Sequence, residues 1–81
     1  LRFIRIARDQ YIEAFSTGDY VNSGMSEVRV AYLAAELSRR LDDREKAIRY
    51  FSVVIEQQRT SNEIKIIDMA KDAWNDMRQA Q

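Results

Sequence analysis

The chain has 81 residues, which is enough for one domain. Thirteen basic and thirteen acidic residues give a net charge of zero, so no overall field attracts the chain to nucleic acid or an anionic membrane. It contains no cysteine and no histidine, which excludes disulfides, zinc–thiolate sites, thiol catalysis and a histidine general base. Proline is absent and glycine occurs twice, so the composition predicts an almost entirely helical protein.

The first helix is predicted over residues 2–16. Apolar side chains recur there with a period near 3.6, at Ile4, Ala7, Tyr11 and Phe15. A loop is expected over about 17–25, and Gly18 suits the position just after a helix, where φ is positive. Because the sequence opens without a methionine, we expect it to be a fragment of a longer chain.

The second helix is predicted over 26–41 and begins with a serine, Ser26, that can cap it. Its centre, from Val28 to Leu37, is apolar on nearly all sides. A helix of this kind is buried by more than one neighbour, so this helix should lie in the middle of the structure. The longest apolar run, 30–35, has six residues and is far shorter than the roughly 18 that suggest a membrane span.

Two further helices are predicted over 43–59 and 62–79. Asp42 is expected to cap the third helix with Glu45 as its capping-box partner, and Thr60 to cap the fourth with Glu63. The short connection at 42–43 implies that the second and third helices form an antiparallel hairpin. A single helix over 44–79 is the alternative, but three consecutive cap-type residues at 60–62 favour a break.

Residues 30–55 resemble one tetratricopeptide repeat, which is a pair of antiparallel helices with small residues at their crossing. Ala35 and Ala47 stand at the small positions of that repeat, and Phe51 at its aromatic position. The family's early aromatic is replaced by Ala31 and its inter-helix glycine by Asp42. Together with the four predicted helices, the resemblance leads us to expect one all-α domain over 1–81, with four antiparallel helices in a tetratricopeptide-like repeat or bundle.

A second resemblance covers more of the chain. Gly24-Met25, the segment 31–55 and a helix containing Ala70-Lys71-Asp72 and Trp74 are similar to the C-terminal half of a family of uncharacterised bacterial proteins. In that family a cysteine-containing, zinc-binding segment comes first. The present chain has no cysteine, so the metal is not carried over. This resemblance implies a cytoplasmic bacterial protein with no assigned activity.

The tetratricopeptide resemblance places Tyr32, Glu36, Arg39 and Arg40 on the concave face, where partner segments bind in related proteins. Tyrosine and arginine are common at binding hot spots, although an ordinary buried Tyr32 is an equally reasonable interpretation. The family's peptide-carboxylate clamp needs lysine and asparagine where this chain has Tyr32 and Glu36. The leading hypothesis is a non-catalytic protein–protein interaction or assembly module. Its partner would be another protein or the N-terminal region of its own chain, and a homodimer is also possible.

The alternative hypothesis is nucleic-acid or anion binding through arginines. Arg2, Arg5 and Arg8 recur at three-residue intervals, and Arg44 follows Arg39 and Arg40 across a predicted turn. These arginines can equally pair with neighbouring carboxylates.

Metal binding and catalysis have less support. Asp68, Asp72 and Asp76 form a carboxylate stripe that could attract a hard cation, but a solvated helix face is the favoured interpretation and needs no metal. We therefore expect no metal or cofactor. No nucleophile–base pair or phosphate-binding loop is recognisable, so the chain is not expected to be an enzyme. Trp74 is expected to anchor the fourth helix to the core.

Overall fold

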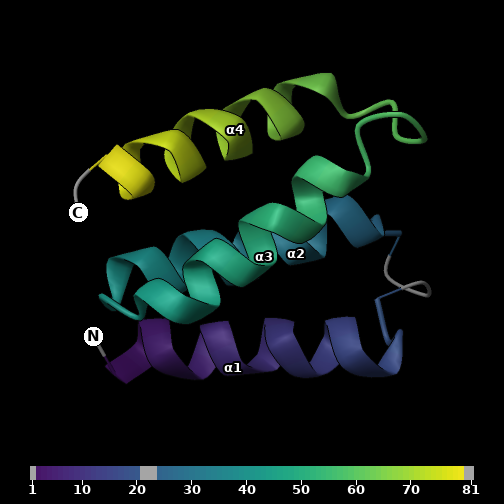
Figure 1. Ribbon diagram of the computed structural model, residues 1–81. Helices are drawn as coiled ribbons and strands as arrows, with labels where there is room; N and C mark the ends of the chain where they lie inside the picture. Colours follow the sequence, from purple (N-terminus) through teal and green to yellow (C-terminus); the bar gives the residue numbers. More distant parts are fainter. Residues whose placement is uncertain (1, 21–23, 80–81) are drawn as a thin grey trace.

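Four α-helices account for most of the protein in the computed structural model, which describes residues 2–20 and 24–79. The helices are α1 (Arg2–Thr17), α2 (Glu27–Arg40), α3 (Arg44–Glu56) and α4 (Ile64–Gln79). Consecutive helices run in opposite directions along the chain (Figure 1). The predicted all-α fold with four helices is confirmed.

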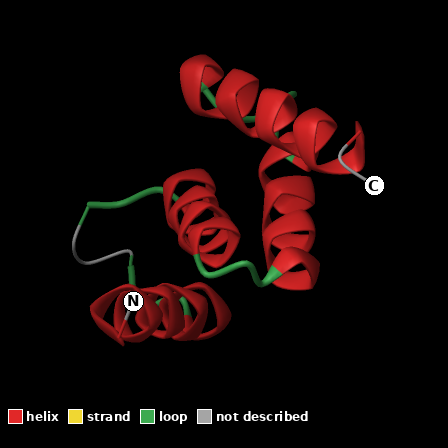
Figure 2. Ribbon diagram, turned by 90° about the vertical axis from the view of Figure 1, so that its left-hand side faces the viewer, coloured by secondary structure: helices red, strands yellow, loops and turns green. Residues whose placement is uncertain are grey.

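Helix α2 occupies the centre of the arrangement. Its backbone lies close to those of α1, α3 and α4, whereas the backbones of α1 and α4 do not approach each other over the described residues. Figure 2 shows α1 and α4 at opposite ends with α2 and α3 between them. The molecule measures 38 × 34 × 16 Å, so the helices form an open, flat array. The prediction that α2 lies between neighbours is confirmed.

The core lies between α2, α3 and α4 and contains several alanines. Ala31, Ala34 and Ala35 of α2 and Ala47 of α3 are fully buried, and their small side chains let the two helices come close together. The largest fully buried side chain belongs to Phe51 of α3. Its ring packs edge-on against Tyr32, with centroids 5.9 Å apart.

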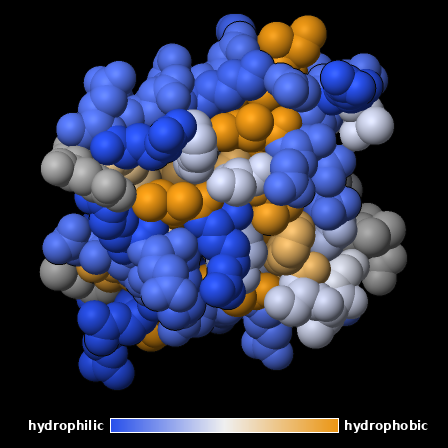
Figure 3. Space-filling model, viewed as in Figure 1, coloured by the Kyte–Doolittle hydropathy of each residue, from blue (hydrophilic) through white to orange (hydrophobic). Residues whose placement is uncertain are grey.

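Helix α1 and helix α4 attach to this core differently. Phe15 of α1 packs edge-on against Tyr50 of α3, with ring centroids 5.7 Å apart. Helix α4 contributes the buried Ile67 and Ala70, and Trp74 packs against the same cluster while remaining half-buried. Apolar side chains also reach the surface between α4 and the α2–α3 pair, bordered by hydrophilic ones (Figure 3).

The turn between α2 and α3 corrects one of the cap predictions. Asp43, and not Asp42, caps α3: its carboxylate accepts from the backbone N–H of Lys46 at 3.4 Å. Asp42 is occupied in ending α2, where it adopts a left-handed conformation with φ of 61°. The N–H of Asp42 donates to Arg39 O at 3.1 Å and that of Asp43 to Ser38 O at 2.8 Å, the bonds of a Schellman motif. The stop of one helix and the start of the next therefore use adjacent aspartates.

The break between α3 and α4 is real, and a single helix over 44–79 is excluded. Helix α3 ends at Glu56, three residues earlier than predicted, and α4 begins at Ile64, two residues later. Thr60 does not cap α4, because its hydroxyl lies against Gln57 of the preceding turn. Ser61 instead accepts from the N–H of Glu63 at 3.1 Å.

The remaining terminal signals behave as predicted. Ser26 caps α2 by accepting from the N–H of Arg29 at 3.1 Å. Gly18 follows α1 with φ of 78°, and its N–H donates to Ala14 O at 2.8 Å. Both confirmed signals depend only on local sequence.

Candidate functional site

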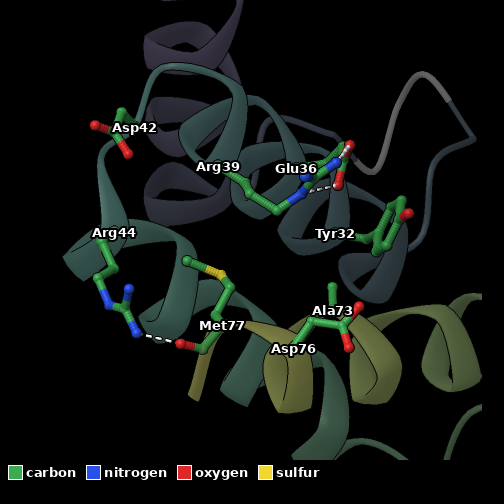
Figure 4. Close-up of a pocket in the computed structure, with 8 residues that line it drawn as sticks. All are labelled: Tyr32, Glu36, Arg39, Asp42, Arg44, Ala73, Asp76 and Met77. Carbon is green, nitrogen blue, oxygen red and sulfur yellow. Dashed lines mark hydrogen bonds and ion pairs between the residues drawn. The ribbon is translucent and has the colours of Figure 1, made fainter. Parts of the chain in front are cut away.

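A pocket of about 500 Å³ lies between α2 and α4, bounded by the α2–α3 turn and the first residue of α3 (Figure 4). Helices α2 and α4 both end here, so their C-terminal turns lie at the same end of the molecule (Figure 1). The pocket is lined by Tyr32, Glu36, Arg39, Asp42, Arg44, Ala73, Asp76 and Met77. Three of these, Tyr32, Glu36 and Arg39, are among the four residues predicted to bind a partner.

The α2 wall is built around one carboxylate and two arginines. Arg39 donates to both oxygens of Glu36, with Nε–Oε2 at 3.1 Å and Nη2–Oε1 at 2.5 Å. Arg40 reaches Glu36 Oε1 from the next position at 3.4 Å. Arg40 does not line the pocket, so it supports the wall through Glu36. The i, i+3 and i, i+4 spacings place these side chains on one helix face.

The electrostatics of this wall favour an ionised Glu36. Burial opposes ionisation of its carboxyl group, but the hydrogen bonds and positive charges of Arg39 and Arg40 outweigh burial and lower its pKa. The pKa of Tyr32 is raised by burial and by the nearby negative charge of Glu36, against the opposing effect of the two arginines. Around neutral pH the wall therefore presents a neutral phenol and a compensated carboxylate.

The opposite wall comes from α4 and was not identified from the sequence. Ala73 and Met77 are one turn apart on α4 and contribute apolar surface, and Asp76 contributes a carboxylate. Arg44 of α3 donates a hydrogen bond to the backbone carbonyl of Met77, in the last turn of α4. This contact ties the start of α3 to the end of α4 and leaves the Arg44 side chain along the edge of the pocket (Figure 4).

The pocket contains acidic and basic side chains, and they differ in whether they have bonded partners. Its lining holds three carboxylates and two guanidinium groups, so its formal charge is −1. Both guanidinium groups have hydrogen-bonded partners, in Glu36 and in the Met77 carbonyl. Within the described residues, Asp42 and Asp76 have no hydrogen bond or ion pair through their carboxylates, and Asp76 acts on Arg39 only through its charge.

Residues 1–77 match the model of a family described as an uncharacterised protein conserved in bacteria (DUF2225). The chain belongs to this family. The match covers α1, α2, α3 and nearly all of α4, so every residue of the pocket lies within the family's domain. No curated protein and no solved structure matches the chain. None of the helices in the described part of the chain is long and apolar enough to cross a membrane.

The arginines predicted to bind anions are not equally available in this family member. Arg2 and Arg5 are exposed on α1, but Arg8 is only 8% exposed. Arg8 forms ion pairs with Asp9 at 2.7 Å and with Asp43 at 2.8 Å. Arg8 is therefore less accessible to an anion than Arg2 and Arg5, because its guanidinium group joins α1 to the α2–α3 turn.

The carboxylate stripe on α4 is likewise divided. Asp76 lines the pocket, whereas Asp68 and Asp72 are exposed residues outside its lining. Among residues 2–20 and 24–79, no three acidic side chains come together in a way that could hold a metal ion. Asp68, Asp72 and Asp76, which the sequence groups in one stripe, therefore do not form one site in the described structure.

Proposed function

We propose that this domain is a non-catalytic protein-interaction module of the tetratricopeptide-like type, and that a partner segment binds in the pocket between α2 and α4. The observation that carries the proposal is the pocket itself. It combines a half-buried aromatic side chain, an alanine and a methionine with a rim of charged groups, a composition typical of sites that hold a peptide side chain.

The packing of the hairpin supports the tetratricopeptide-like interpretation. Ala35, Ala47 and Phe51, at the family's two small positions and its aromatic position, are all completely buried. Asp42, at the family's glycine position, has the positive φ that glycine would adopt most easily. Helix α4 also lies beside α2, as the first helix of a following repeat would.

The charges of the pocket support binding rather than catalysis. Glu36 is the pocket carboxylate that has hydrogen-bonded partners. Arg39 and Arg40 hold it in the ionised form and lower its pKa. A general acid at neutral pH needs the opposite shift. Arg39 and Arg44 each have a hydrogen-bonded partner already, in Glu36 and in the Met77 carbonyl.

The test is capture of a partner from bacterial lysate with three immobilised proteins: wild type, Ala73→Arg and Asn75→Arg. Ala73 lines the pocket, whereas Asn75 is an exposed residue of the same helix outside it. Both variants add the same side chain, and circular dichroism would verify that both fold. We expect a protein that survives moderate salt to be recovered with wild type and Asn75→Arg and lost with Ala73→Arg. Equal recovery with both variants would place binding elsewhere.

The anion-binding alternative has less support, because Arg8 is buried and Arg39 and Arg40 share Glu36. Binding through arginines to nucleic acid would weaken steeply with salt and disappear after nuclease treatment, so the same capture experiment tests it. Sedimentation at several concentrations tests the homodimer. The expectations of a cytoplasmic protein, and of a partner in the N-terminal region of its own chain, stay predictions.

A further inference from the structure

We infer that the group recognised in the pocket between α2 and α4 is a basic side chain, the lysine or arginine of a partner segment. This inference rests on the proposed function and specifies the chemistry of the partner. The arginines in the sequence had suggested an anionic ligand instead. The structure favours a basic ligand because the pocket arginines already have hydrogen-bonded partners, whereas two pocket carboxylates do not.

The two pocket arginines already have hydrogen-bonded partners, although each keeps N–H donors that no described residue binds. Arg39 uses Nε and Nη2 in a bidentate contact with Glu36, and the side chain of Glu36 is only 17% exposed. An incoming carboxylate could bind Arg39 in the same bidentate way only by displacing Glu36, which leaves it the single contact through Nη1. Arg44 is bound to the Met77 carbonyl, one of the carbonyls that the end of α4 leaves without a helical partner.

Among the charged side chains of the lining, the two without a hydrogen bond or ion pair are acidic. The carboxylates of Asp42 and Asp76 lie on the lining without a hydrogen bond or ion pair in the described structure. The pocket also lies at the C-terminal turns of α2 and α4, and each helix end carries a partial negative charge. Figure 4 shows Asp76 on the α4 side and Asp42 on the turn, with the Arg39–Glu36 pair between them on α2. A cation entering the pocket is therefore attracted by Asp76 on the α4 side and by Asp42 on the turn, and by the C-terminal ends of two helices. The charges of Arg39 and Arg44 and the N-terminal end of α3 oppose this attraction, and the formal charge of the lining is −1.

The apolar part of the lining suits the stem of the same side chain. Lysine and arginine carry a chain of methylene groups that packs on apolar surface while the charged head stays polar. Tyr32, Ala73 and Met77 provide that surface within the pocket. The Tyr32 ring can also attract a cation lying over its face. A short acidic side chain would use neither feature.

The experiment is a selection of phage-displayed random nonamer peptides on the immobilised 81-residue chain. Peptides that bind wild type and fail to bind Ala73→Arg define the pocket ligands. We expect a lysine or arginine at one fixed position in these peptides. The strongest arginine peptide is then synthesised together with its citrulline analogue, which keeps the shape of arginine and removes its charge.

Binding of the two peptides is measured by calorimetry to wild type, Asp76→Asn and Asp68→Asn. Asp68 is a matched control, because it is an exposed aspartate of α4 outside the pocket. We expect citrulline to weaken binding to wild type about fivefold, the upper range for an exposed ion pair. Asp76→Asn should weaken binding of the arginine peptide by a similar factor and reduce the difference between the two peptides. Asp68→Asn should change neither affinity.

The outcomes separate this inference from the proposed function. Two results would overturn the inference of a basic side chain but not the proposed interaction module. The first is that the peptides sensitive to Ala73→Arg have acidic or purely apolar anchors. The second is that the arginine and citrulline peptides bind with equal affinity. If no selected peptide loses binding to the folded Ala73→Arg variant, the pocket is not the binding site, and both proposals fail.

Discussion

Arg8 and Asp43 form an ion pair, and we expect its two charges to be unequal in their effect on stability. Removing the charge of Asp43, which leaves Arg8 behind, should destabilise the protein more than removing the charge of Arg8. Arg8 is 8% exposed, and its Nη1 lies 2.8 Å from Asp43 and 3.5 Å from the Ser38 hydroxyl. The Asp43 side chain is 29% exposed, so water reaches it. Burial acts to lower the pKa of Arg8, but its bonds to Asp9 and Asp43 outweigh burial and raise it.

The expected magnitudes follow from these exposures. Asp43→Asn keeps a side chain that can cap α3, but it leaves Arg8 with the exposed Asp9 as its charged partner and the Ser38 hydroxyl as a neutral one, so we expect a loss of about 2 kcal/mol. Arg8→Met keeps an apolar stem and leaves a carboxylate that is hydrated and held by Lys46, so the loss should be about 1 kcal/mol. The double variant should resemble Arg8→Met, because the buried cation is gone.

The assay is urea unfolding of the wild type, both single variants and the double variant, followed by circular dichroism. The expected coupling energy is about 2 kcal/mol, well above the roughly 0.5 kcal/mol within which independent sites add. Asp43→Ala serves as the control for the cap and should be about 1 kcal/mol worse than Asp43→Asn. If the two single effects simply add, the pair does not hold α1 to the turn and the reasoning is refuted.

Three further outcomes are expected. Phe51→Ala removes the largest fully buried side chain and should destabilise the protein by about 3–5 kcal/mol in the same assay, and a loss below about 1 kcal/mol would contradict the central place of Phe51 in the core. Asp42→Gly relieves a left-handed conformation with φ of 61° and should raise the melting temperature by about 4–8 °C, whereas Asp42→Ala should not. The pKa of Glu36 in the folded protein is lowered below its ordinary value of 4.5. Ionised Glu36 therefore stabilises the folded state at pH values above 4.5, and this stabilisation is lost as the pH falls through the lower pKa of the folded state. Wild type should therefore lose stability more steeply than Glu36→Gln when urea unfolding is repeated at progressively more acidic pH, and parallel curves would contradict the shift.

Local sequence signals predicted the helices well because capping and periodicity act over a few residues. Ser26 and Gly18 have the roles expected of them, and the break before α4 occurs where three cap-type residues follow one another. One error lies where two local signals compete for one residue. Asp42 is a good cap by type, but ending α2 in a Schellman motif requires a residue with positive φ, and the cap of α3 then passes to Asp43.

The site was only half predictable for a different reason. Tyr32, Glu36 and Arg39 share one face of α2, so helical spacing and the repeat resemblance were sufficient to group them. Ala73, Asp76 and Met77 enter the pocket only because α4 returns beside α2, a tertiary contact with no local signature. The bonds of the arginines also depend on tertiary contacts. Arg8 forms an ion pair with Asp43, 35 residues away, and Arg44 donates a hydrogen bond to the last turn of α4.

The two adjacent aspartates of the α2–α3 turn connect the stability of the fold to the proposed binding site. Asp43 is fixed by Arg8 and by its cap on α3, whereas Asp42, the preceding residue, lines the pocket. Helix α1 contributes no residue to that pocket, yet it holds the turn that positions one of the two free carboxylates. Loss of Arg8 should therefore weaken binding of a basic peptide while its preference for arginine over citrulline, which Asp76 also supports, persists. A binding defect of this kind would separate the positioning of the turn from the charge of the pocket.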